Sequence, residues 1–296
     1  MRFASSAWLL TVLISFMTAG FVCVVDGCAT TSKAPIAPVM TKEQSRATPQ
    51  TLEAAVNSEF RTPANKARDQ YRHPLQTLTF FGVKNDMTIV EISPGGGWYA
   101  EILAPFLAGN GQYIAAENRG PHGGNKQFSE WMALYPQVAG KMSMTEFNPP
   151  DQTAIAPPGT ADMVLTFRNV HNWMGKQQDL NAFKAFYKAL KGGGTLGVVE
   201  HRQNPKVKQD PEAKSGYVTE DYVMKLAKKA GFKFVAKSEI NANPKDTKDY
   251  PEGVWTLPPT YRLGDKDRDK YAAIGESDRM TLKFTKPKVH PKPMPY

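Results

Sequence analysis

A run of three glycines is the most distinctive chemical feature of the sequence. A short apolar segment, residues 87–92, leads almost directly into Gly95, Gly96 and Gly97. Glycines let a backbone approach a ligand closely, and a helix that begins after them offers free N–H groups. Glu117 follows twenty residues after Gly97, at a position from which a carboxylate can accept hydrogen bonds from two ribose hydroxyls. This spacing predicts a nucleotide or nucleoside site, with a plain strand-to-helix turn as the alternative.

Two histidines lie at the ends of later apolar segments. His171 follows residues 162–167, and His201 comes directly after Glu200. His171 is a candidate general base that would deprotonate a substrate oxygen or nitrogen, and a packed or helix-capping histidine is the alternative. Two histidines and a carboxylate can bind zinc or iron. The three residues have no regular local spacing, however, so the sequence predicts no metal site.

Three aromatic residues adjoin the same segments. Trp98 and Tyr99 follow the glycines, and Trp173 follows His171. Aromatic walls favour a cationic group of a ligand through cation–π contact. Together with His201, these residues are predicted to line a substrate pocket, although core packing would account for any one of them.

Alternating strands and helices must position these groups. The periodicity predicts an N-terminal helical extension over residues 51–81, and then a β–α alternation. The predicted strands are 87–92, 112–117, 142–147, 162–167, 195–200, 232–240 and 279–284, and the predicted helices between them are 98–107, 127–138, 179–191 and 219–230. Such alternation indicates an α/β fold with a doubly wound, mostly parallel seven-stranded sheet. The last two strands have no helix between them, so the final strand is expected to be antiparallel.

The loop between those two strands is too long for a hairpin. Residues 241–278 form an insertion that includes Tyr250, Trp255, Tyr261 and Arg262. The preceding strand is expected to be parallel and to end on the crevice side, where ligands bind in open α/β sheets. The insertion is therefore predicted to roof the site as a lid, with a self-packed surface loop as the alternative.

The glycine loop matches one class of cofactor site better than others. The glycine loop lacks the G-x-G-x-x-G pattern of dinucleotide sites, and the sequence contains no Gly-Lys-Ser or Gly-Lys-Thr of a P-loop. The loop resembles motif I of the class I S-adenosylmethionine-dependent methyltransferases, acid-x-G-x-G-x-G, with Ser93 in place of the first glycine. The run LKGGGTLGVVEH also resembles the approach to the fifth strand in that fold. More closely, FFGVKNDMTIVEISPGGGWYAEILAPFL, TFRNVHNW and IGESDRMTLKF resemble a bacterial family of exported predicted methyltransferases.

This resemblance covers about residues 60–285 and implies roles for individual residues. The glycine loop would hold the amino-acid end of S-adenosylmethionine, and Glu117 would hold its ribose. Glu91 matches the acid of motif I. Asn169, at the end of the fourth strand, completes the expected cofactor-binding set of Glu91, Gly95, Gly96, Gly97, Glu117 and Asn169.

The N-terminus has the features of a bacterial export signal. Arg2 precedes an uncharged, mostly apolar stretch over residues 7–25, and Gly27 and Cys28 follow. The ending resembles a lipoprotein box, in which the cysteine is lipidated. We therefore expect a signal peptide over 1–27, lipidation at Cys28 and a tether over 28–50. A single domain over 51–285 and a disordered tail over 286–296 would follow. An ordinary cleaved signal or an uncleaved anchor is the alternative.

Composition restricts the possible partners. The two cysteines, Cys23 and Cys28, precede the predicted domain, which excludes a disulfide framework and cysteine nucleophile chemistry there. The formal charge is +9, but the basic residues are scattered without an arginine-rich stripe, so no nucleic acid partner is expected. The combined interpretation is methyl transfer from S-adenosylmethionine to a small-molecule acceptor in the cell envelope. The alternative is a methyltransferase-like lipoprotein that binds a nucleoside-type ligand without methyl transfer.

Overall fold

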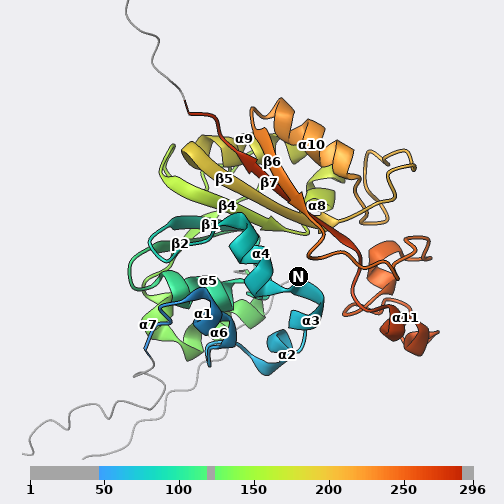
Figure 1. Ribbon diagram of the computed structural model, residues 1–296, viewed down its shortest axis with the longest axis horizontal. Coiled ribbons are helices and arrows are strands. Elements are labelled where there is room, and N and C mark those ends of the chain that lie inside the picture. Colours follow the sequence, from blue (N-terminus) through green and yellow to red (C-terminus); the bar gives the residue numbers. More distant parts are fainter. Residues whose placement is uncertain (1–46, 119–123, 289–296) are drawn as a thin grey trace, which may run out of the picture. The chain divides into compact units, whose positions relative to one another are not determined.

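Seven strands form one mixed sheet in the computed structural model (Figure 1), with the order β3-β2-β1-β4-β5-β7-β6. The strands are β1 Thr88–Ile92, β2 Gln112–Glu117, β3 Ser143–Glu146, β4 Ala161–Phe167, β5 Leu190–His201, β6 Lys233–Ser238 and β7 Arg279–Thr285. Strands β1 to β5 pair in parallel, and β7 pairs antiparallel with both β5 and β6. The predicted fold class is confirmed, including the antiparallel final strand.

The structure describes residues 47–118 and 124–288. The predicted signal peptide 1–27, Cys28, most of the tether and most of the tail lie outside these residues. Within the described ranges, no helix combines the length and the apolar character needed to cross a membrane.

Helices cover both faces of the sheet (Figure 1). Their bounds are α5 Ala100–Leu107, α6 Lys126–Leu134, α7 Pro136–Ala139, α8 Val170–Met174, α9 Asp179–Ala189, α10 Glu220–Lys229 and α11 Arg268–Ile274, with the 3₁₀ helix η1 over Gly253–Thr256. Consecutive strand residues point to opposite faces. Accordingly, Ile89 joins a core with Leu103 of α5, whereas Val90 joins a second core with Phe186 of α9.

Two predicted helices end or break earlier than expected. The predicted helix 179–191 ends at Ala189, because Gly192–Gly194 belong to β5. Residues 191–194 form extra backbone where the β4–β5 register shifts, and Gly193 adopts φ +89° there. The predicted helix 127–138 is divided into α6 and α7 at Pro136, which cannot continue the hydrogen-bond pattern of the preceding turn.

The N-terminal extension is helical, but it is broken into four short pieces. They are α1 Leu52–Asn57, α2 Pro63–Lys66, α3 Asp69–Arg72 and α4 Pro74–Phe81. Pro63 and Pro74 each occupy a first helical position, where proline needs no N–H partner. His73 has φ +42° and separates α3 from α4.

Three side chains attach the extension to the helices beside the glycine loop. Trp131 Nε1 donates to the Phe60 carbonyl at 2.7 Å, and Trp98 Nε1 donates to the Asn65 carbonyl at 3.0 Å. Glu101 accepts from the Thr62 N–H at 2.9 Å. These contacts hold α2 and the residues just before it close to the glycine loop.

We expect Trp131→Phe to destabilise the protein by about 1–3 kcal/mol, because the buried Phe60 carbonyl would lose its donor. Urea unfolding of the variant and the wild type measures the difference. Phe234→Leu, at an exposed position of β6, serves as the control and should change stability by less than about 0.5 kcal/mol. Equal stabilities for Trp131→Phe and the wild type would show that this contact does not hold the extension.

Candidate functional site

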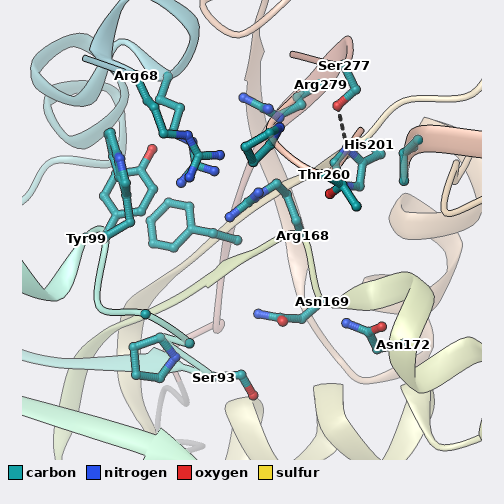
Figure 2. A pocket seen from close by; sticks show the side chains of 18 of the residues that line it. Arg68, Ser93, Tyr99, Arg168, Asn169, Asn172, His201, Thr260, Ser277 and Arg279 are labelled. Carbon is teal, nitrogen blue, oxygen red and sulfur yellow. Dashed lines mark hydrogen bonds between the residues drawn. The ribbon is translucent and has the colours of Figure 1, made fainter. Parts of the chain in front are cut away.

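A cavity of about 390 Å³ lies at the carboxyl ends of β1, β4 and β5 (Figure 2). Its walls come from the glycine loop, the extension, the segments after β4 and β5, the start of β7 and the insertion 241–278. The volume lies near the lower end of the range for small-molecule sites. Of the predicted site residues, those that line it are Glu91, Gly95, Gly96, Trp98, Tyr99, Asn169, His171 and His201.

The glycine loop turns sharply where the sequence predicts it. Ser93 and Gly95 have φ values of +49° and +58°. A Cβ added at Gly95 would meet no protein atom within 4 Å, so a side chain there would project into open space. The N–H groups of Gly95 and Gly96 donate to no other described residue. The loop therefore presents a backbone without a side chain at Gly95, and the unpaired N–H groups of Gly95 and Gly96, to the cavity.

Gly97, which was predicted to bind the cofactor, packs against other parts of the protein. It is not among the residues that line the cavity, and its N–H donates to the Pro94 carbonyl at 3.0 Å. A Cβ at Gly97 would lie 2.7 Å from the Phe128 ring, and its φ is +84°. Packing against α6 and the positive φ explain this glycine without a ligand.

Glu91 is a buried acid in the cavity wall. The Tyr113 hydroxyl donates to Glu91 Oε2 at 2.6 Å. Burial raises the pKa of Glu91 to about 8, and the neighbouring Glu117 also raises it. Glu91 is thus mainly protonated at neutral pH and adds little negative charge to the cavity.

A second hollow of about 160 Å³ adjoins the main cavity. Ser93, Asn169 and Asn172 line both spaces. Asn169 Nδ2 donates to the Ile92 carbonyl at 3.0 Å and so ties the end of β4 to the end of β1. An elongated ligand could therefore extend from one hollow into the other past Asn169.

Glu117 lies at the end of β2, as predicted, but it is 7% exposed and is not among the residues that line either hollow. Its neighbour Asn118 lines the smaller one. The next residues, 119–123, lie outside the described part of the chain. The predicted ribose contact would therefore require Glu117 to turn toward that hollow.

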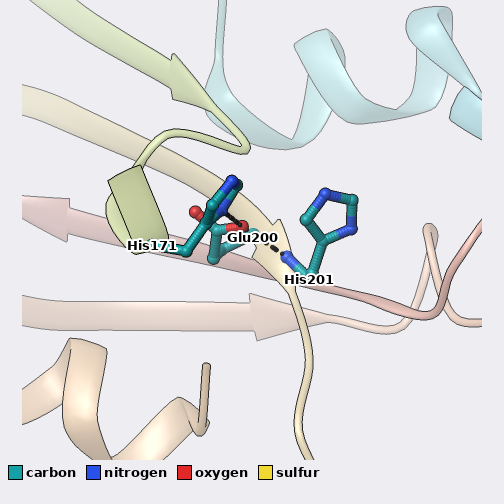
Figure 3. Close-up of side chains that lie close together, drawn as sticks. All are labelled: His171, Glu200 and His201. Atoms are coloured by element: carbon teal, nitrogen blue, oxygen red, sulfur yellow. Dashed lines mark hydrogen bonds and ion pairs between the residues drawn. The ribbon is translucent and has the colours of Figure 1, made fainter. Parts of the chain in front are cut away.

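The predicted base His171 has a carboxylate partner. His171 Nδ1 lies 3.0 Å from Glu200 Oε1, and Glu200 is fully buried (Figure 3). Glu200 also accepts from the backbone N–H groups of Val170, at 2.6 Å, and His201, at 2.8 Å. A fixed carboxylate that binds Nδ1 orients the ring and leaves Nε2 for another partner. The sequence identified Glu200 only as a possible metal ligand and missed this positioning role.

The same three residues are close enough to hold a metal ion. One ligand atom from each of His171, Glu200 and His201 lies within 4.8 Å of the other two. Both Glu200 oxygens, however, already accept N–H hydrogen bonds, and His201 Nδ1 lies 2.5 Å from Ser277 Oγ. Burial and the neighbouring His171 hold the pKa of His201 well below its usual range, so His201 is neutral. These contacts favour an acid–base role over a metal-binding one.

The predicted aromatic wall is only partly assembled. Tyr99 stacks on Phe167 with ring centroids 3.6 Å apart. Trp98 lies beside two guanidinium groups, those of Arg61 at 4.9 Å and Arg72 at 4.7 Å. Trp173 lines the smaller hollow, away from Trp98 and Tyr99 in the main cavity, and packs against Phe186. The contacts of Trp98 favour neighbouring arginines over a sulfonium.

The insertion 241–278 contributes a side of the cavity. Val254, Trp255 and Thr260 line it, and the Trp255 ring meets His171 edge-on with centroids 5.9 Å apart. Arg262 lies over Trp255, with its Cζ 4.6 Å from the ring centroid. Tyr250 and Tyr261 are not among the lining residues.

Sequence analysis missed four arginines in the cavity wall. They are Arg68, Arg72, Arg168 and Arg279. They are far apart in the sequence and match no local pattern, so only the fold brings them together. Ligands of open α/β sheets bind beyond the carboxyl ends of the strands. This rule pointed to the segment after β4, which contains Arg168, and no other signal in the sequence pointed to these arginines.

No family model and no curated protein sequence matches the chain. Among solved structures, the fold is similar to that of a Galdieria sulphuraria protein provisionally named a sarcosine dimethylglycine methyltransferase. The TM-score is 0.51 at 13% identity, over 76% of this chain and 89% of that one. It is also similar to the (4+2)-cyclase SpnF, with a TM-score of 0.50 at 14% identity, over 80% of this chain and 93% of that one. These likenesses concern the fold, which is the Rossmann-like fold of methyltransferases.

The raised pKa of Glu91 predicts a pH-dependent stability. The folded state keeps the Glu91 proton up to about pH 8, whereas the unfolded chain releases it near pH 4.5, so wild-type stability falls as pH rises between these values. Glu91→Gln removes this loss. We expect the stability of the variant relative to the wild type to increase by roughly 2–4 kcal/mol from pH 5 to pH 9, measured by urea unfolding.

Glu130→Gln, at an exposed position of α6, is the control for that experiment. Its stability relative to the wild type should not change between pH 5 and pH 9. A Glu91→Gln difference that stays constant from pH 5 to pH 9 would contradict a protonated Glu91 in the folded protein.

Proposed function

We propose that this protein transfers a methyl group from S-adenosylmethionine to a small-molecule acceptor. One observation carries the proposal: the glycine turn faces a cavity that His171 also lines, and the buried Glu200 binds the His171 ring from behind. The turn lies where the strand order reverses, which is where open α/β sheets bind ligands. Fold alone would not carry it, because a protein named as a cyclase has a similar fold.

The residues present fit this cofactor. The open space at Gly95 and the free N–H groups of Gly95 and Gly96 suit the amino-acid end. The smaller hollow beside Asn118 and Asn169 suits the nucleoside end, with Glu117 as the proposed ribose acceptor. When bound, the cofactor would supply a methyl carbon whose bond to sulfur breaks as an acceptor lone pair attacks, with the bonding electrons remaining on sulfur.

The chain's own residues would handle the acceptor proton. His171 lines the cavity, and Glu200 fixes its Nδ1. Nε2 would accept the proton that the attacking oxygen or nitrogen loses, and the buried Glu200 carboxylate would stabilise the resulting imidazolium. Trp255 and His201 border the same space and would limit access of water. Binding of a nucleoside ligand without turnover would favour the non-catalytic lipoprotein instead.

Cofactor binding tests the proposal. We expect the purified protein to bind S-adenosylhomocysteine in calorimetry. Gly95→Val should weaken binding at least tenfold, because its side chain would occupy the space in front of the loop. Glu117→Ala should weaken it roughly 10- to 150-fold through loss of a charged acceptor, about 1.5–3 kcal/mol. His171→Ala should leave binding nearly unchanged, because the base acts on the acceptor.

Gly159→Val is the matched control for Gly95→Val. Gly159 also has a positive φ and open space at its Cβ, but it is not among the residues that line the cavity. Its substitution should affect folding stability and leave affinity unchanged. No heat and no thermal shift with wild-type protein at millimolar S-adenosylhomocysteine or S-adenosylmethionine would overturn the proposed function.

We also propose that the protein acts outside the cytoplasm as a lipoprotein. The basic start, the apolar stretch 7–25 and the Gly27–Cys28 pair support export and lipidation at Cys28. Two or more acyl chains anchor a protein stably. Cys28→Ala should therefore move the protein from the membrane to the soluble fraction, and mass spectrometry of the wild-type N-terminal peptide should show an acylated cysteine. An unmodified N-terminus at another position, for example after Ala19, would contradict lipidation.

A further inference from the structure

Four guanidinium groups converge on one end of the main cavity. Arg68 and Arg72 come from the start and end of α3, Arg168 follows β4, and Arg279 begins β7. In Figure 2, Arg68, Arg168 and Arg279 extend toward the same part of the pocket, on the side away from Ser93. The sheet and the N-terminal extension thus supply positive charge to a single place.

One buried carboxylate, that of Glu276, forms ion pairs with three of these arginines. It pairs with Arg68 at 2.6 Å, with Arg72 at 3.2 Å and with Arg279. Burial alone would raise the pKa of Glu276, but Arg279, Arg72 and Arg68 hold it well below its usual range. Glu276 is therefore ionised and neutralises one of the four positive charges.

Each of these three arginines keeps one guanidinium nitrogen without a partner in the described residues. Arg72 and Arg279 are each 3% exposed, yet Arg72 Nη2 and Arg279 Nε make no hydrogen bond within residues 47–118 and 124–288. Arg68 Nη2 is likewise buried without a partner there. The Arg168 guanidinium forms no hydrogen bond or ion pair with another described side chain.

This excess of charge is costly for the folded protein. Burial lowers the pKa of Arg168 to about 10, and Arg279 lowers it further as a like charge. Glu91, the other acid in the wall, is mainly protonated at neutral pH. The ion pairs with Glu276 give Arg68, Arg72 and Arg279 a structural role. Arg168 has no such ion pair, so they do not explain its position. Arg168 is partly buried in the cavity wall, where an anionic ligand would supply the missing counter-charge.

We infer that the arginine end of the cavity binds a carboxylate or phosphate group of the methyl acceptor, so that the acceptor is a small anion held beside His171. The anion site rests on the arginines alone, whereas its assignment to the acceptor rests on the proposed function. His201 lies between the two regions: its ring centroid is 5.5 Å from that of His171, and it lines the cavity together with Arg279. Guanidinium forks bind both carboxylate and phosphate in two-point contacts.

Calorimetric titration of citrate and of inorganic phosphate into the purified protein at pH 7 tests this inference. Arg168→Gln is the informative variant because it breaks no ion pair. It should weaken binding of the preferred anion at least tenfold, which corresponds to about 1.4 kcal/mol. Without an anion, its melting temperature should equal or exceed that of the wild type, since like-charge repulsion is reduced. Lys225→Gln removes an exposed charge on α10 and should leave anion affinity unchanged.

The outcomes separate the anion site from the cofactor site. Citrate binding that depends on Arg168 would indicate a carboxylate acceptor, and phosphate binding that depends on it would indicate a phosphorylated one. The absence of both at millimolar concentration, or equal losses in Arg168→Gln and Lys225→Gln, would overturn the inference. Equal weakening of S-adenosylhomocysteine and citrate by Arg168→Gln would overturn the acceptor assignment, because the arginines would then hold the cofactor's carboxylate. If the protein binds anions through Arg168 but binds no cofactor, the proposed function is overturned and the proposed anion site is supported.

Discussion

The reversal of strand order between β1 and β4 determines where each candidate group lies. Strand β1 pairs with β2 on one side and β4 on the other, and the connections that follow β1 and β4 leave the sheet on opposite faces. The two connections therefore diverge beyond the paired strand ends and leave a crevice between them. The glycine loop enters it from β1, and Arg168, Asn169 and His171 enter it from β4. The hydrogen bond from Asn169 to the Ile92 carbonyl fixes the spacing of the two strand ends.

The cavity has an unusual charge balance for a site that would receive a sulfonium. Glu91 is mainly neutral, Glu276 is ionised among three arginines, and Arg168 lacks a counter-charge in the described residues. A cationic donor would be repelled by this arrangement when it bound alone. An anionic acceptor would reduce that repulsion, and thermodynamic linkage then requires each ligand to strengthen binding of the other. A negatively charged acceptor would therefore reconcile the arginines with the proposed methyl transfer.

Much of the fold could be predicted from the sequence, because its elements are defined by local patterns. Strand β2 has the predicted bounds of Gln112–Glu117, and the glycine turn lies between β1 and α5 as expected. Local patterns do not reveal contacts between residues that are distant in the sequence. A Cβ at Gly97 would meet the Phe128 ring, and Trp173 packs against Phe186 of α9. The arginine cluster joins Arg68 to Arg279 through Glu276, a contact that no local spacing reveals.

On our proposals, the two hollows bind a nucleoside cofactor and a separate anion at the same time. A crystal structure of the protein with S-adenosylhomocysteine and citrate would test this arrangement. We expect adenosine in the smaller hollow beside Asn118 and Asn169, the amino-acid end over Gly95, and a citrate carboxylate on Arg168. A cofactor carboxylate on Arg168, or a cavity that contains citrate alone at saturating S-adenosylhomocysteine, would contradict it.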